Sequence, residues 1–216
     1  MTRLGLLDHV VIAGPDLEAL IVWFAERTGV TAPRGGAHPT GTANALVALT
    51  RDGERGPHYI ELIGPDPDRA DPAVPETFGI ASLSEPAVVA YSVHPDDIVA
   101  TVEHARAQGI DPGDVQPLSR RTPDGVLLEW RLTRGQERRL ELPFLIDWGT
   151  TPQPGVGDLP TVELVDFVRT ELDPFPIAAD LAAYGLGEGA AEVVAGERSG
   201  YRLTLRGADG QLIELT

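Results

Sequence analysis

The 216-residue chain contains no cysteine, so disulfides, zinc-finger ligands and thiol nucleophiles are all excluded. Lysine is absent too, and all 17 basic residues are arginine. The sequence also lacks a P-loop, a Gly-x-Ser-x-Gly elbow, a dinucleotide-binding fingerprint and an HExxH motif. The common phosphate-loop, serine-hydrolase, nicotinamide-binding and metalloprotease signatures therefore offer no function for this chain.

Positive charge is scarce, because 33 acidic residues face 17 arginines and the net charge is −16. Nucleic acids and anionic membrane surfaces are bound by basic patches, which this balance disfavours. No apolar run approaches the roughly 18 residues of a membrane-spanning helix, and the N-terminal MTRLGLLDHV carries no cleavable hydrophobic segment. We therefore expect a cytoplasmic protein with no nucleic-acid and no membrane partner, which the lack of cysteine also fits.

One order of elements, a strand followed by a helix and further strands, recurs three times along the chain. Each predicted helix ends at a glycine that suits a helix stop: Gly29, Gly109 and Gly185. The predicted strands cover about 6–13, 44–49 and 58–64, then 88–93, 126–133 and 142–149, then 162–168 and three short C-terminal segments. We predict an α+β fold with βαβββ modules at about 5–64 and 88–149, paired within residues 1–150, and a third βαβββ-like module at 160–216.

Two of the apolar strands each carry one side chain that could ligate a metal. His9 lies in LDHVVIAG and Glu61 in HYIELIGP. Imidazole and carboxylate groups are donors that divalent metals choose, and an unpaired buried carboxylate is costly. If the two strands are neighbours, His9 and Glu61 form half of a metal site; the alternatives are a core histidine and an exposed carboxylate.

The βαβββ unit, with DH in its first strand and a carboxylate in its last, resembles the vicinal oxygen chelate superfamily, and within it the glyoxalase-like group. The likeness is carried by LDHVVIAG, HPTGTANALVAL, YIELIGPDP, SRRTPDG and PFLIDWG. The resemblance implies that paired modules curl a mixed or antiparallel sheet into a cup around a divalent metal (Fe, Mn, Ni or Zn), with helices on the outer face. It places the metal ligands at His9, Glu61 and Asp147. The remaining ligand position falls near Ala90 or Tyr91, neither a usual ligand, so the site has three ligands or binds without metal.

The resemblance implies a metal-dependent lyase, isomerase or dioxygenase that acts on a small oxygenated substrate, with Glu61 as metal ligand or general base. His38 and Asn44 flank a glycine-rich loop that could close over this substrate. Arg120 and Arg121 precede the PDG turn, and one of them, which we assign as Arg121, could grip a substrate carboxylate. The alternative function is metal-free binding of a drug or metabolite. Because two modules pair with each other, the third lacks a partner, and we expect it to meet its counterpart in a homodimer.

Overall fold

The computed structural model describes residues 5–70, 73–122, 125–135, 139–186 and 190–216. Its helices and strands follow one another along the chain. They are β1 (Leu7–Ala13), α1 (Leu17–Thr28), β2 (Arg34–Ala37), β3 (Thr42–Arg51), β4 (Glu54–Pro65), η1 (Thr77–Ser82), β5 (Ala87–Val93), α2 (Ile98–Ala107), β6 (Asp114–Arg121), β7 (Leu127–Arg134), β8 (Phe144–Asp147), η2 (Pro154–Val156), β9 (Thr161–Glu171), α3 (Phe175–Tyr184), β10 (Glu192–Ala195), β11 (Gly200–Arg206) and β12 (Leu212–Leu215).

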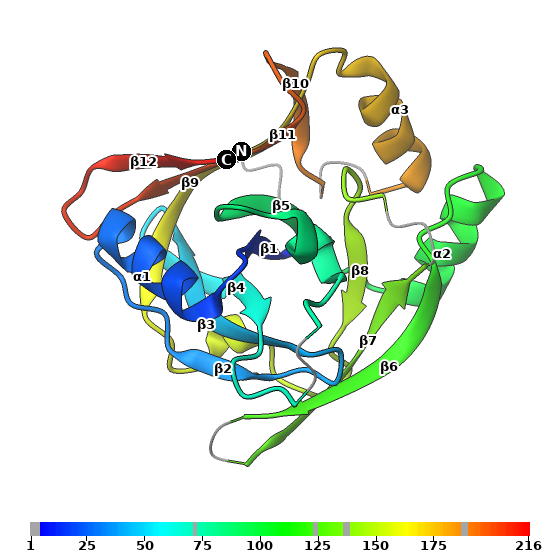
Figure 1. Ribbon diagram of the computed structural model, residues 1–216. Helices are drawn as coiled ribbons and strands as arrows, with labels where there is room; N and C mark the ends of the chain where they lie inside the picture. The colour runs from blue at the N-terminus through cyan, green and yellow to red at the C-terminus, as the bar shows by residue number, and fades with distance from the viewer. Residues whose placement is uncertain (1–4, 71–72, 123–124, 136–138, 187–189) are drawn as a thin grey trace.

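The strands form one curled mixed sheet of 12 strands in the order β12-β11-β9-β3-β4-β1-β5-β8-β7-β6, with β10 joined to β9 and β2 to β3. In the first module β1 runs parallel to β4, and in the second β5 runs parallel to β8. The modules meet where β1 pairs antiparallel with β5. The helices lie around the outside of the curl (Figure 1), which confirms the predicted α+β cup with outer helices.

Helix α1 shows how the local sequence produces these elements. Asp16 caps its N-terminus by accepting a 2.9 Å hydrogen bond from the backbone N–H of Ala19. Gly29 ends it in the left-handed conformation, at φ 72°, which glycine adopts without strain. Between these caps, Leu20 and Phe24 are fully buried and pack the helix against the outer face of the sheet.

Strand β1 is buried on both faces, because it lies between the main core and the cup. Val10 and Ile12 belong to the main core beneath α1, whereas Val11 and Ala13 belong to a smaller cluster on the cup side. A strand covered on both faces is apolar along its whole length rather than at alternate positions. His9 and Asp8 are therefore polar exceptions inside a fully buried strand.

The third module packs against the other two within the same chain. Strand β9 pairs in parallel with β3 at Ala48–Thr50. The rings of Phe167 and Tyr201 lie 5.3 Å and 5.7 Å from that of Tyr91 in β5. The chain thus supplies a partner for its own third module, which removes the reason for expecting a homodimer; the homodimer itself stays a prediction.

Two strands were not predicted from the sequence. Strand β2 is Arg-Gly-Gly-Ala, within the glycine-rich stretch that we interpreted as a loop. Strand β6 is polar and contains Pro117, which a strand at the end of a sheet tolerates. The predicted PDG turn at 123–125 lies partly outside the described residues. In the third module the first strand, β9, pairs with β10 and β11, whereas in the other two modules the first strand pairs with the last.

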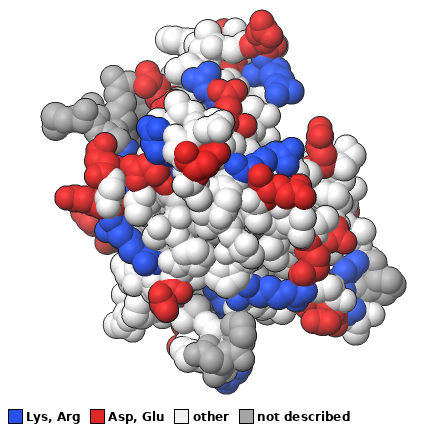
Figure 2. All heavy atoms as spheres, turned by 90° about the vertical axis from the view of Figure 1, so that its left-hand side faces the viewer, with Lys and Arg blue, Asp and Glu red and all other residues white. Residues whose placement is uncertain are grey.

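The charged side chains on the face drawn in Figure 2 are intermingled, with arginines set between acidic residues around an uncharged centre. None of the helices in the described part of the chain is long and apolar enough to cross a membrane.

Candidate functional site

A pocket of about 700 Å³, its mouth included, occupies the concave side of the cup. Strands β1, β3 and β4 form one wall, and β6, β7 and β8 form the facing wall. The pocket is lined by His9, His38, Thr40, Thr42, Asn44, Leu46, Tyr59, Glu61, Ile63, Thr77, Phe78, Leu118, Arg120, Trp130, Leu132, Arg134, Phe144, Ile146 and Trp148. Both modules of residues 1–150 therefore contribute side chains to a single site.

His9 is held by a buried carboxylate behind it. Its Nδ1 lies 2.6 Å from Oδ1 of Asp8, while Oδ2 of Asp8 accepts hydrogen bonds from Trp148 (2.9 Å) and Gln153 (2.6 Å). Burial alone would raise the pKa of Asp8, but the hydrogen bonds and the attraction of His9 outweigh it and leave that pKa below its ordinary value. An ionised carboxylate only accepts hydrogen bonds, so Nδ1 carries the proton and Nε2 faces the pocket.

A local irregularity of β1 brings these two neighbours together. Adjacent side chains of a regular strand point to opposite faces. The pairing of β1 with β5 shifts register between Leu7 and His9, at the position of Asp8. Bulges of this kind re-aim side chains and are common beside active sites.

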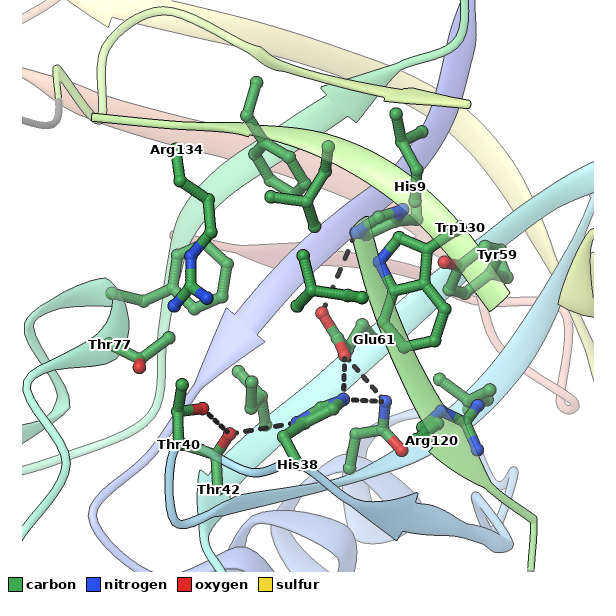
Figure 3. Close-up of a pocket in the computed structure, with 18 of the residues that line it drawn as sticks. His9, His38, Thr40, Thr42, Tyr59, Glu61, Thr77, Arg120, Trp130 and Arg134 are labelled. Carbon is green, nitrogen blue, oxygen red and sulfur yellow. Dashed lines mark hydrogen bonds and ion pairs between the residues drawn. The ribbon is translucent and has the colours of Figure 1, made fainter. Parts of the chain in front are cut away.

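Glu61 lies at the centre of the polar cluster (Figure 3). Its Oε1 accepts a 2.7 Å hydrogen bond from Nδ2 of Asn44, and its Oε2 lies 3.7 Å from Nε2 of His9. The register explains this proximity, because β1 and β4 pair His9 with Tyr59 and Val11 with Glu61. Oδ1 of Asn44 is buried without a hydrogen-bond partner among the described residues. The amide nitrogen of Asn44 faces Glu61, because the flipped orientation would place the amide oxygen against a carboxylate oxygen, and both atoms only accept hydrogen bonds.

His38 approaches the same carboxylate from the loop after β2. Its Nε2 lies 3.9 Å from Oε1 of Glu61, and its Nδ1 lies 2.9 Å from the hydroxyl of Thr42. Burial lowers the pKa of His38, and the charges of Arg120 and Arg134 add to that effect against the opposing attraction of Glu61. His38 is therefore a neutral ring at pH 7 that faces Glu61.

The rest of the lining is largely aromatic. The His9 ring stacks on Tyr59 at 4.6 Å and meets the edge of Phe144 at 5.4 Å. Trp130 and Trp148 lie 5.5 Å apart on the facing wall. The pocket thus combines an apolar body with a few convergent polar groups, which is typical of small-molecule sites.

The structure brings together His9, Glu61, His38 and Asn44 in this lining. It does not bring Asp147 or Arg121 to them. Asp147 bonds Arg131, which lowers the pKa of that carboxyl, while its neighbours Ile146 and Trp148 line the pocket. Arg121 instead donates to the carbonyl of Gly125.

Asp8 and Arg134 are the site residues that sequence reasoning missed, and Arg120 was considered beside Arg121 but not chosen. Arg120 is 7% exposed and donates to the carbonyl of Gly35 at 2.9 Å. The signal for Arg120 was the alternation of β6, in which Leu118 and Arg120 share a face and Arg121 takes the other. Because β6 was not predicted to be a strand, that alternation could not be applied.

A metal ion needs several donor atoms arranged around one point. His9, His38 and Glu61 are the donor types of two-histidine, one-carboxylate sites, and Asp8 behind His9 resembles the outer support of such sites. However, the two histidines approach different oxygens of Glu61. Among the described residues, no group of three or more histidine, aspartate or glutamate side chains is arranged to hold a metal ion. The residues in this arrangement do not fit a metal.

Comparisons with known proteins agree with the fold. Residues 7–184 match the profile of a family described as "Glyoxalase-like domain". A hypothetical protein from Staphylococcus aureus is similar in structure, with a TM-score of 0.66 and 13% identity over 97% of this chain and 98% of that one.

Weaker likenesses link the chain to two solved structures of methylmalonyl-CoA epimerase. The enzyme from Mycobacterium tuberculosis has a TM-score of 0.35 and 22% identity over 61% of this chain and 81% of its own. An epimerase in complex with methylmalonyl-CoA and NH4+ has a TM-score of 0.45 and 22% identity, over 70% and 99%. No curated protein matches the sequence.

Proposed function

The chain belongs to the glyoxalase-like domain family, whose profile matches residues 7–184, and on that premise we propose that it is an isomerase or lyase that moves a proton on a small oxygenated substrate. The observation that carries the proposal is the approach of Glu61 Oε2 to His9 Nε2, 3.7 Å apart inside the pocket. Two groups that each accept a proton thus converge on one part of the pocket, where a substrate C–H or O–H can approach both.

The roles of the two groups follow from what surrounds them. Asn44 donates to one oxygen of Glu61, which leaves the other free to act as the base. His9 accepts the second proton, from a substrate O–H, at Nε2, which carries no proton at the outset, and the ionised Asp8 behind it stabilises the charged ring that forms. Glu61 and His9 then return their protons to the neighbouring carbon and its oxygen. The apolar rings of the lining lower the local polarity, which strengthens both interactions.

Dependence on Fe, Mn, Ni or Zn is a separate prediction from the sequence, and the arrangement of the described donors does not support it. The proton transfer proposed above uses only the chain's own side chains. Metal analysis of protein purified without chelators tests this separately: a stoichiometric metal that His9→Ala abolishes would establish the metal site.

The experiment for the proton transfer is deuterium exchange. Wild-type protein in D₂O is mixed with a panel of 2-hydroxy aldehydes, 2-hydroxy ketones and 2-oxo acids, and loss of the α C–H signal is followed by proton NMR. Glu61→Gln should slow exchange by about 10²–10⁴-fold, the usual contribution of a general base. Glu129→Gln is the matched control, because Glu129 is exposed on β7 outside the pocket lining. Exchange at the wild-type rate in Glu61→Gln contradicts the proposal.

A second candidate function, metal-free binding of a small aromatic molecule, is favoured by Trp130, Trp148, Tyr59 and Phe144 in the lining. It predicts quenching of tryptophan fluorescence by aromatic ligands without turnover. Wild-type protein that binds panel members and exchanges none of their protons would favour this function over the enzyme.

A further inference from the structure

Arg134 points its guanidinium group into the pocket from β7, beside Thr77 (Figure 3). No hydrogen bond or ion pair joins this group to any residue that the structure describes. Several other arginines of the described segments do have a carboxylate partner: Arg131 bonds Asp147, Arg106 bonds Asp111, and Arg139 bonds Glu141. The donors of Arg134 are thus available to a ligand in the pocket.

The charge of the pocket is the reverse of that of the whole protein. Acidic residues outnumber arginines 33 to 17 along the chain. The pocket lining contains two arginines, Arg120 and Arg134, and one carboxylate, Glu61. The ionised Asp8 behind His9 offsets this excess on its side of the cup. Because apolar walls reduce screening, an anion is therefore attracted to the arginines of the lining.

The strand places Arg134 by simple alternation. Trp130, Leu132 and Arg134 line the pocket, whereas Arg131 lies on the other face of β7 with its own carboxylate partner. The side chain of Arg134 therefore extends past two apolar residues that form the wall. A ligand held there can lie along these side chains and still reach Glu61 within the same pocket.

We propose that Arg134, with the hydroxyl of Thr77 beside it, binds the carboxylate of the substrate and so selects small organic acids. The reacting end of that acid lies at Glu61, a placement that rests on the proposed proton transfer. Arg134 is thus a specificity-determining residue, and a guanidinium suits the task because it can hold both carboxylate oxygens at once.

The test compares two probes of the same shape, 3-phenylpropanoate and its neutral amide 3-phenylpropanamide. Binding is followed by quenching of the fluorescence of Trp130 and Trp148, which line the pocket. The wild type should bind the acid at least about tenfold more tightly than the amide, as expected for a hydrogen-bonded charge pair. Arg134→Met should abolish that preference and leave amide binding unchanged.

Arg121→Met is the matched control, since Arg121 lies outside the lining and should keep the wild-type preference for the acid. Arg134→Lys should keep part of it. Equal binding of acid and amide by the wild type, absence of acid binding, or a preference that survives in Arg134→Met would overturn the proposal. Glu61→Gln separates this result from the proton transfer, because it should stop exchange and retain the preference for the acid.

Discussion

Replacing Asp8 with asparagine should separate the folding role of this buried carboxylate from its role at His9. Asparagine keeps an oxygen that can accept from Trp148 and Gln153, which now donate at 2.9 Å and 2.6 Å. Toward His9 it offers an N–H₂ group, which can only donate. His9 must then accept at Nδ1 and carry its proton on Nε2, the tautomer opposite to the wild type.

The expected magnitudes differ between activity and stability. In Asp8→Asn, Nε2 of His9 would donate toward Glu61 and could no longer take a proton, so exchange should fall by about 10²–10⁴-fold. The free energy of unfolding should fall by only about 1–3 kcal/mol, because neutral hydrogen bonds replace charged ones. Asp8→Ala leaves the buried donors of His9 and Trp148 unpaired, and should cost about 2–6 kcal/mol at about 1–3 kcal/mol for each.

The assays are deuterium exchange, thermal unfolding and nitrogen NMR of the His9 ring. For a chain of this size each kcal/mol lowers the melting temperature by about 2–4 °C. Asp16→Asn is the control, because asparagine caps α1 as well as aspartate does. Wild-type exchange in Asp8→Asn would refute the tautomer argument, and an Asp8→Ala variant as stable as the wild type would refute the energetic one.

Three further predictions concern stability. The pKa of His38 in the folded protein lies below its ordinary 6.5, so the unfolded state binds more protons than the folded state as pH falls below about 6.5. The free energy of unfolding should therefore decline below that pH, and urea titrations of His38→Gln should show a smaller decline. A Cβ on Gly155 would come within 2.0 Å of a carbonyl oxygen of β4, so Gly155→Ala should cost about 1–3 kcal/mol in urea unfolding, whereas Gly200→Ala, which meets nothing within 4 Å, should not. Tyr91→Phe leaves the N–H of Ala191 without its 3.2 Å acceptor and should cost about 1–3 kcal/mol; an unchanged melting temperature would argue against that contact.

The glyoxalase-like resemblance and the curled α+β sheet were predicted from the sequence and are confirmed. Strands such as β1 and β4 could be predicted because apolar runs are local signals. The choice between Arg120 and Arg121 could not be made, since it depends on the alternation of β6, whose polar residues carry no such signal. Asp8 was missed because a regular strand would point it away from His9, and its re-aiming depends on the pairing of β1 with β5, which is a long-range property.

The pairing of β9 with β3 has a consequence for how the molecule resists aggregation. Ala48–Thr50 of β3 would otherwise present unpaired backbone groups, and such groups invite strand addition by another molecule. Thr161–Glu163 of the same chain already occupies them. An incoming strand would compete with a tethered one whose local concentration is far higher than its own. The C-terminal module thus protects this edge of β3 from pairing with other molecules. A shortened chain that ends before β9 should aggregate through the exposed edge.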